Sequence, residues 1–162
     1  TVRADELGLE AEQAEFIAQR QPLRVVLDSQ GRLPSDAKIL KGKGPILVAV
    51  KHGVQIESDS NDLEVLPLNH SESGLDLVTL LDELAKRQCN EVLVETGATL
   101  AGQFVAQGLV DEMVLYMAPC LLGNDARGLL NLPFTEMAQK KTVKIVDTRM
   151  VGADMRLTIK FD

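Results

Sequence analysis

The hydrophobic positions of this chain fall into short runs separated by polar and glycine-containing segments. Two of these runs, residues 46–50 and 92–94, are continuously apolar and do not alternate with polar residues. A strand without a polar face is typical of a parallel or mixed sheet that is covered on both sides by helices. We therefore predict a helix-covered sheet, organised around the segment 91–112 that contains the second run.

Helical spacing of apolar residues predicts two helices. The first follows the turn at residues 70–74, and the second follows Gly97 and ends at Gly108, because glycine commonly terminates a helix. Apolar faces are expected at Leu75, Val78, Leu81, Leu84 and Ala85 in the first helix, and at Ala101, Phe104, Val105 and Leu109 in the second. Together with strands at 63–68 and 92–94, these helices predict βαβ crossovers between residues 63 and 109.

The rest of the chain is assigned from shorter patterns. Residues 1–21 are rich in Glu and Ala, which predicts partial helix interrupted at Gly8. Residues 143–146 and 155–161 alternate better and predict an antiparallel hairpin at the edge of the sheet. Further elements are expected as strands at 23–27 and 113–118 and as one helical turn at 37–40.

Composition and charge narrow the function classes. The chain has 162 residues, 45% of them hydrophobic, which suits about one domain with a core of aliphatic residues. Its net charge of −7 argues against nucleic acid as the main partner. The apolar runs are too short to cross a membrane. Cys89 and Cys120 form no metal-binding motif and no disulfide framework, so we expect no metal and a reducing cytoplasm.

The segment after residues 92–94 is the strongest candidate for a ligand site. A helix that begins past the carboxyl end of a buried strand directs unpaired N–H groups toward a crevice, where anions bind. Gly97 and Gly102 have the spacing of a phosphate-binding loop, but Gln103 and Phe104 stand where that loop needs Lys and Ser or Thr. The alternative is that both glycines serve only a tight turn and close packing. The glycines alone do not decide between these interpretations.

Other polar residues at strand ends are weaker candidates. Glu95 interacts either with the N–H groups of the helix entry or with a ligand in the crevice, and its position slightly favours the ligand. Asp28 and Ser29 end the first strand, where turn chemistry explains them equally well. His52 and His70 are interpreted as solvated histidines, because no nucleophile motif accompanies them.

Five separated stretches resemble the reductase domain of the bifunctional bacterial riboflavin-biosynthesis deaminase/reductase. They are VETGATLAG at 94–102, GLVDE at 108–112, Ala-Pro with Leu-Leu-Gly within 118–123, Thr-Val with Ala-Asp within 1–5, and VLDS at 26–29. This resemblance implies an α/β fold, namely a dihydrofolate-reductase-like mixed sheet flanked by helices. It also implies hydride transfer from NADPH that reduces the ribosyl group of 5-amino-6-(5-phosphoribosylamino)uracil to the ribityl form. No metal is needed for this step.

The resemblance assigns roles to individual residues. Glu95 and Leu9 would contact the substrate, and Ser29 would lie near the adenosine phosphate of the cofactor. Thr1 and Asp5 would also contact the cofactor. The cofactor diphosphate would be lined by Gly97, Ala98, Thr99, Leu100, Ala101, Gly102 and Gln103. No residue is assigned as the proton donor.

Two departures from the family pattern bear on activity. Glu12 stands where an arginine is expected to meet the substrate phosphate, unless the alignment shifts locally. The chain also begins inside the family's Gly-Thr-Val motif, so we expect a single reductase domain, residues 1–162, that lacks its first strand and helix and the upstream zinc deaminase domain. The family suggests a homodimer in the cytoplasm. A non-catalytic ligand-binding or oligomerisation domain with the same fold is the alternative.

Overall fold

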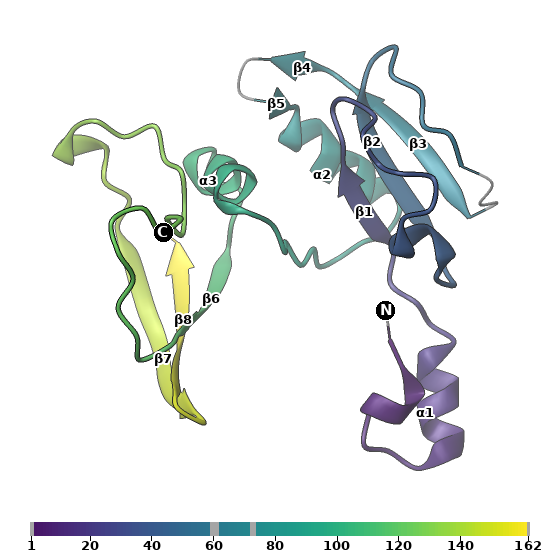
Figure 1. Ribbon diagram of the computed structural model, residues 1–162, viewed down its shortest axis with the longest axis horizontal. Helices are drawn as coiled ribbons and strands as arrows, with labels where there is room; N and C mark the ends of the chain where they lie inside the picture. Colours follow the sequence, from purple (N-terminus) through teal and green to yellow (C-terminus); the bar gives the residue numbers. More distant parts are fainter. Residues whose placement is uncertain (1, 59–61, 72–73, 162) are drawn as a thin grey trace. The chain divides into compact units, whose positions relative to one another are not determined.

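The computed structural model describes residues 2–58, 62–71 and 74–161 and comprises two compact units, Thr1–Gln88 and Cys89–Asp162. Figure 1 shows the elements of both units. The first contains a parallel sheet with helix α2 (Leu77–Lys86). The second contains helix α3 (Ala98–Ala106) and an antiparallel sheet. No helix in the described part of the chain is long and apolar enough to cross a membrane.

The sheet of the first unit confirms three predicted strands. Its strands are β1 (Arg24–Leu27), β2 (Ile46–Lys51) and β3 (Leu63–Leu68), paired in parallel in the order β1-β2-β3. The register places Leu27 opposite Ala49, and Lys51 opposite Leu68. All three carboxyl ends therefore lie at one edge of the sheet.

Strand β2 is buried on both faces, as its continuous apolar run predicts. Residues 46–50 are at most 1% exposed. Ile46, Val48 and Val50 form one core cluster with Leu40, from the short 3-10 helix η2 (Lys38–Lys41). Alternation along a strand turns Leu47 to the opposite face. Full burial of a central strand therefore requires cover on both sides of the sheet.

Helix α2 lies beside this sheet (Figure 1). An ion pair of 2.5 Å between Arg87 and Glu64 joins the end of the helix to β3. The buried side chains of α2 are Leu77, Leu80 and Leu84. The predicted face was partly wrong, because Val78 and Ala85 are exposed. Leu75 belongs to strand β5 (Gly74–Leu75), so the helix begins later and the leucines at 77, 80 and 84 form its apolar stripe.

The remaining elements of the first unit are short. They are η1 (Ala4–Glu6), α1 (Ala11–Ala18) and strand β4 (His70–Ser71), which pairs with β5. Gly8 has a φ of +62° and separates η1 from α1, which confirms the predicted interruption. The guanidinium of Arg24 donates to the carbonyl oxygens of Ile39, Gly42 and Gly44 at 2.7, 3.1 and 2.6 Å. This side chain ties the loop before β2 to the amino end of β1.

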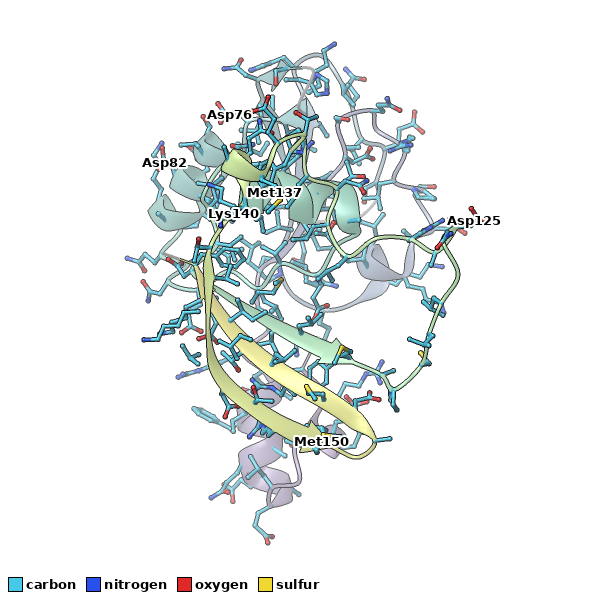
Figure 2. The ribbon with its side chains drawn as sticks, turned by 90° about the vertical axis from the view of Figure 1, so that its left-hand side faces the viewer. Asp76, Asp82, Asp125, Met137, Lys140 and Met150 are labelled. Carbon is cyan, nitrogen blue, oxygen red and sulfur yellow. The ribbon has the colours of Figure 1, made fainter. Side chains whose placement is uncertain are left out.

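In the second unit, the predicted antiparallel hairpin is confirmed. Its three-stranded sheet has the order β6-β8-β7, with β6 (Glu112–Met117), β7 (Val143–Val151) and β8 (Asp154–Phe161). The hairpin turns at Gly152, which has a φ of +63°, and Figure 2 shows Met150 near this turn. The register shifts between Ile145 and Asp147. A short 3-10 helix, η3 (Met137–Gln139), precedes β7.

The predicted strand at residues 92–94 is absent. These residues have no strand assignment, and Val92, Leu93 and Val94 are 43%, 84% and 40% exposed. A strand depends on hydrogen bonds to a neighbouring strand, and no described strand pairs with this segment. The βαβ crossover between residues 63 and 109 was therefore also wrong. An apolar run alone does not create the partner that a strand needs.

The capping of α2 yields a test of stability. Asp76, the N-cap residue, accepts hydrogen bonds from the Thr79 N–H at 3.1 Å and the Thr79 hydroxyl at 2.7 Å. The backbone hydrogen bond from Thr79 is the main reason that the pKa of Asp76 lies below its usual value of 3.8. The ionised form is therefore favoured in the folded state, and its stabilising contribution is present above pH 3.8 and is lost as the pH falls below this value.

We expect Asp76→Ala to lower the urea midpoint of unfolding at pH 7, because the first turn of α2 loses its cap. Asp76→Asn retains a capping oxygen, so it keeps most of the stability at pH 7, but its amide does not titrate and the acid dependence contributed by Asp76 disappears. Asp82→Ala is the matched control on the exposed side of the same helix; both aspartates are labelled in Figure 2. An equal loss in Asp82→Ala would contradict the capping role.

Candidate functional site

The first turn of α3 presents an uncapped helix N-terminus. Gly97 is its N-cap residue, with φ −78° and ψ 168°, and no side chain caps the turn. The bond from Ala101 N–H to the Gly97 carbonyl, at 3.1 Å, starts the helical pattern. The N–H groups of Ala98, Thr99 and Leu100 therefore have no acceptor within the helix. Three donors that find no acceptor among the described residues, at the positive end of a helix dipole, suit an anionic group.

The two glycines of this segment differ in what requires them. A Cβ atom at Gly102 would overlap the carbonyl oxygen of Asn131 and lie 2.8 Å from its carbon, so close packing requires glycine there. At Gly97 a Cβ atom would meet nothing within 4 Å, and the backbone is extended. The packing interpretation is confirmed for Gly102 only. At Gly97, the missing side chain leaves the N–H groups of α3 open to a ligand.

Asn131 is a positioning residue that the sequence reasoning missed. Its N–H donates to the Ala98 carbonyl at 3.0 Å, and its side-chain amide donates to the Thr99 hydroxyl at 3.1 Å. The loop that contains Asn131 is thereby attached to the first turn of α3. No local signal in the sequence marks Asn131, because its partners lie more than thirty residues earlier in the chain.

Glu95 lies two residues before the N-cap of α3 and is exposed. In the ranges that the structure describes, it accepts no hydrogen bond from the entry of α3, and no ion pair includes it. Its carboxylate is therefore available to a ligand near the first turn. Residues 97–103 extend from the N-cap past the middle of α3, and Glu95 lies just before them in the chain.

The other predicted contacts lie in the first unit. Asp5, in η1, is exposed, and so is Leu9, at 47%. Ser29 is half-buried just after β1. Thr1 lies outside the described residues. Asp5, Leu9 and Ser29 belong to the first unit, whereas Glu95 and residues 97–103 belong to the second.

Turn chemistry accounts for Asp28, as one interpretation of the sequence proposed. Its carboxylate is buried and accepts hydrogen bonds from the N–H groups of Gln30 at 3.3 Å and Leu33 at 2.7 Å. His52 and His70 are both exposed, as predicted. Within the described residues, no three His, Cys, Asp or Glu side chains form a possible metal site.

Comparison with known proteins identifies the family. The model of the RibD C-terminal domain matches residues 1–157. The chain belongs to the RibD C-terminal domain family. The RibD family predicted from the five sequence stretches is therefore confirmed.

Relatives and a solved structure agree with this family. The chain is 40% identical over 164 residues to the riboflavin biosynthesis protein RibD of Escherichia coli, covering 97% of this chain and 43% of that protein. It is 30% identical over 142 residues to the 5-amino-6-(5-phosphoribosylamino)uracil reductase of Buchnera aphidicola, covering 86% of this chain and 68% of that protein. Acinetobacter baumannii RibD superposes with a TM-score of 0.76 at 38% identity, covering 96% of this chain and 41% of that one.

These comparisons confirm the fold class. The chain has the dihydrofolate-reductase-like α/β fold, with a mixed set of strands, flanking helices and an antiparallel C-terminal hairpin. It spans less than half the length of the RibD proteins it matches, 43% of the Escherichia coli protein and 41% of the Acinetobacter baumannii protein.

The two glycines of α3 provide a matched pair for mutagenesis. We expect Gly102→Ala to destabilise the protein by about 1–3 kcal/mol, because the new methyl group overlaps the backbone of Asn131. Gly97→Ser should leave stability unchanged or raise it by up to about 1 kcal/mol, because serine is a good N-cap residue. Urea unfolding of both variants measures this difference. Equal destabilisation by the two substitutions would contradict the distinct roles of these glycines.

Proposed function

We propose that this chain provides an NADPH-dependent oxidoreductase activity of riboflavin biosynthesis. The reaction reduces the ribosyl group of 5-amino-6-(5-phosphoribosylamino)uracil to the ribityl form. The main support is the Buchnera aphidicola relative named as this reductase, because the match covers 68% of that protein. This relative links the reductase name to the part of the family that the chain matches.

The cofactor proposal is supported by the first turn of α3. Its open N–H groups fit the cofactor diphosphate, because they donate hydrogen bonds and the helix dipole favours negative charge. Gly97 lets the diphosphate approach, and residues 98–101 and 103 line it, while Gly102 supports this part of the helix by packing on Asn131. Bound NADPH supplies the hydride. The chain orients it, with Asp5 and Thr1 as further contacts and Ser29 near the adenosine phosphate.

For the substrate, we propose Glu95 and Leu9 as contacts. The Glu95 carboxylate accepts hydrogen bonds from the ring N–H or hydroxyl groups of the pyrimidine, and the exposed Leu9 offers an apolar surface. Glu12 lies in the first turn of α1 and is exposed. A carboxylate repels the substrate phosphate, so residues other than Glu12 hold that phosphate.

We propose that residues 1–162 form one reductase domain of a multifunctional, homodimeric and cytoplasmic enzyme. The family match over residues 1–157 supports one domain. The apolar side chains exposed on the edge strand β7, among them Ile145 and Val146, support self-association. Both cysteines are free, which supports a reducing compartment.

Glu95 provides the decisive test, made in the complete protein with any segments that flank these 162 residues. We expect Glu95→Gln to lower kcat/KM for the pyrimidine substrate by about tenfold or more, because the variant loses a charged hydrogen-bond acceptor. The Kd for NADPH should change by no more than about twofold, well below the tenfold that corresponds to 1.4 kcal/mol. Steady-state kinetics and fluorescence titration with NADPH measure both quantities.

Glu91→Gln is the matched control, since Glu91 is an exposed carboxylate on the same segment. Its kinetics should match the wild type. A complete wild-type protein that binds neither NADPH nor the pyrimidine would overturn the reductase proposal and favour a non-catalytic domain.

A further inference from the structure

A row of three methionines crosses the antiparallel sheet of the second unit. The register places Met155 of β8 opposite Met117 of β6 on one side and opposite Met150 of β7 on the other. Residues directly opposite each other in antiparallel strands share one face of the sheet, with Cβ atoms about 4.5–5.5 Å apart. The three thioether side chains therefore lie side by side on one face, near the hairpin turn where Figure 2 labels Met150.

Cys120 adds a thiol to this row. It lies in the loop after β6, and it lines one open pocket together with Met117, Met150 and Met155. The other residues that line this pocket are Ala118, Pro119, Leu121 and Ala153. Four sulfur-containing side chains, from three strands and one loop, thus meet in one pocket.

The sulfur-containing side chains are accessible from outside the protein. Met117 and Met150 are 50% and 61% exposed, and Met155 is half-buried. Cys120 is exposed and free of any disulfide. Methionine has three rotatable bonds and a polarisable sulfur atom, so these side chains can turn toward a common centre.

The donor atoms of the pocket select the kind of ion that it suits. None of the described residues that line it has a carboxylate, hydroxyl or imidazole group. Hard cations such as Mg²⁺ and Ca²⁺ need oxygen ligands, and zinc sites are built from Cys, His and carboxylates. Thioether and thiolate groups are the ligands that Cu(I) prefers. The described residues hold no cluster of His, Cys, Asp and Glu, but this does not bear on a site made mainly of thioethers.

We propose that Met117, Cys120, Met150 and Met155 form a binding site for one monovalent copper ion. The three thioethers and the Cys120 thiolate coordinate Cu(I), and the thiol releases its proton to the solvent when the ion binds. None of the residues proposed for NADPH or for the pyrimidine lines this pocket. Copper binding is therefore separate from the proposed reduction.

The test is a titration of the complete protein with Cu(I) under anaerobic conditions, in competition with the chelator bathocuproine disulfonate. We expect Met150→Leu and Cys120→Ser each to weaken Cu(I) binding at this site by about tenfold or more, because even the loss of a residue that only supports a ligand weakens metal binding about 10–100-fold. Leucine nearly keeps the volume of methionine, and both replaced side chains are exposed, so thermal unfolding without metal should be unchanged.

A fourfold variant removes every proposed ligand. Met117→Leu, Met150→Leu and Met155→Leu combined with Cys120→Ser should bind one Cu(I) fewer per chain than the wild type. Its Kd for NADPH should equal that of the wild type, since the pocket contains no proposed cofactor contact. Equal Cu(I) binding by the wild type and the fourfold variant would overturn the copper site and leave the reductase proposal standing.

Met137→Leu and Cys89→Ser are the matched controls. Both residues belong to the second unit and neither lines the pocket. Met137 is 81% exposed and is labelled in Figure 2. These variants should retain the wild-type affinity for Cu(I). A loss in either control as large as that in Met150→Leu or Cys120→Ser would show nonspecific binding to accessible sulfur and would overturn the proposal.

Discussion

The burial of β2 on both faces is the constraint on which the first unit depends. Five successive apolar residues leave water entirely, and this requires a strand on each side and cover on each face of the sheet. Parallel pairing then brings the carboxyl ends of β1, β2 and β3 to a single edge. Polar residues at the ends of separate strands therefore lie toward the same edge of the sheet, as Ser29 after β1 and Lys51 at the end of β2 do.

A second constraint operates at the start of α3. The loop containing Asn131 packs so closely on the helix that Gly102 has no room for a side chain. This contact, together with the Asn131 hydrogen bonds, attaches the first turn without using its N–H groups. Rigid support on one side and open donors on the other are the features that an anion-binding turn needs.

The overall charge of the chain is negative, which disfavours anionic ligands. A chain with a net charge of −7 repels phosphate-bearing ligands at long range. At physiological ionic strength such repulsion is screened beyond about 8 Å, so contacts closer than this decide binding. The uncapped N–H groups at the first turn of α3 are donors that act over such short distances. Glu12 and Glu95 add further negative charge. The Glu95 carboxylate therefore suits uncharged hydrogen-bond donors of a ligand better than a phosphate group.

Local patterns in the sequence determined several features of this protein. The apolar run of β2, the interruption at Gly8 and the start of α3 after Gly97 depend on residues close together in the chain, and all three were predicted. Leu109, predicted on the apolar face of this helix, lies beyond its end at Ala106. The motifs around Glu95 and residues 97–102 also indicated the family.

Only the tertiary structure decided features that depend on distant partners. Residues 92–94 form no strand because no described strand pairs with them. Leu75 belongs to β5 and not to α2, and this decides which residues form the buried face of the helix. The packing of Gly102 on Asn131 likewise joins residues more than twenty positions apart. Such contacts arise from strand register and packing, which no local pattern encodes.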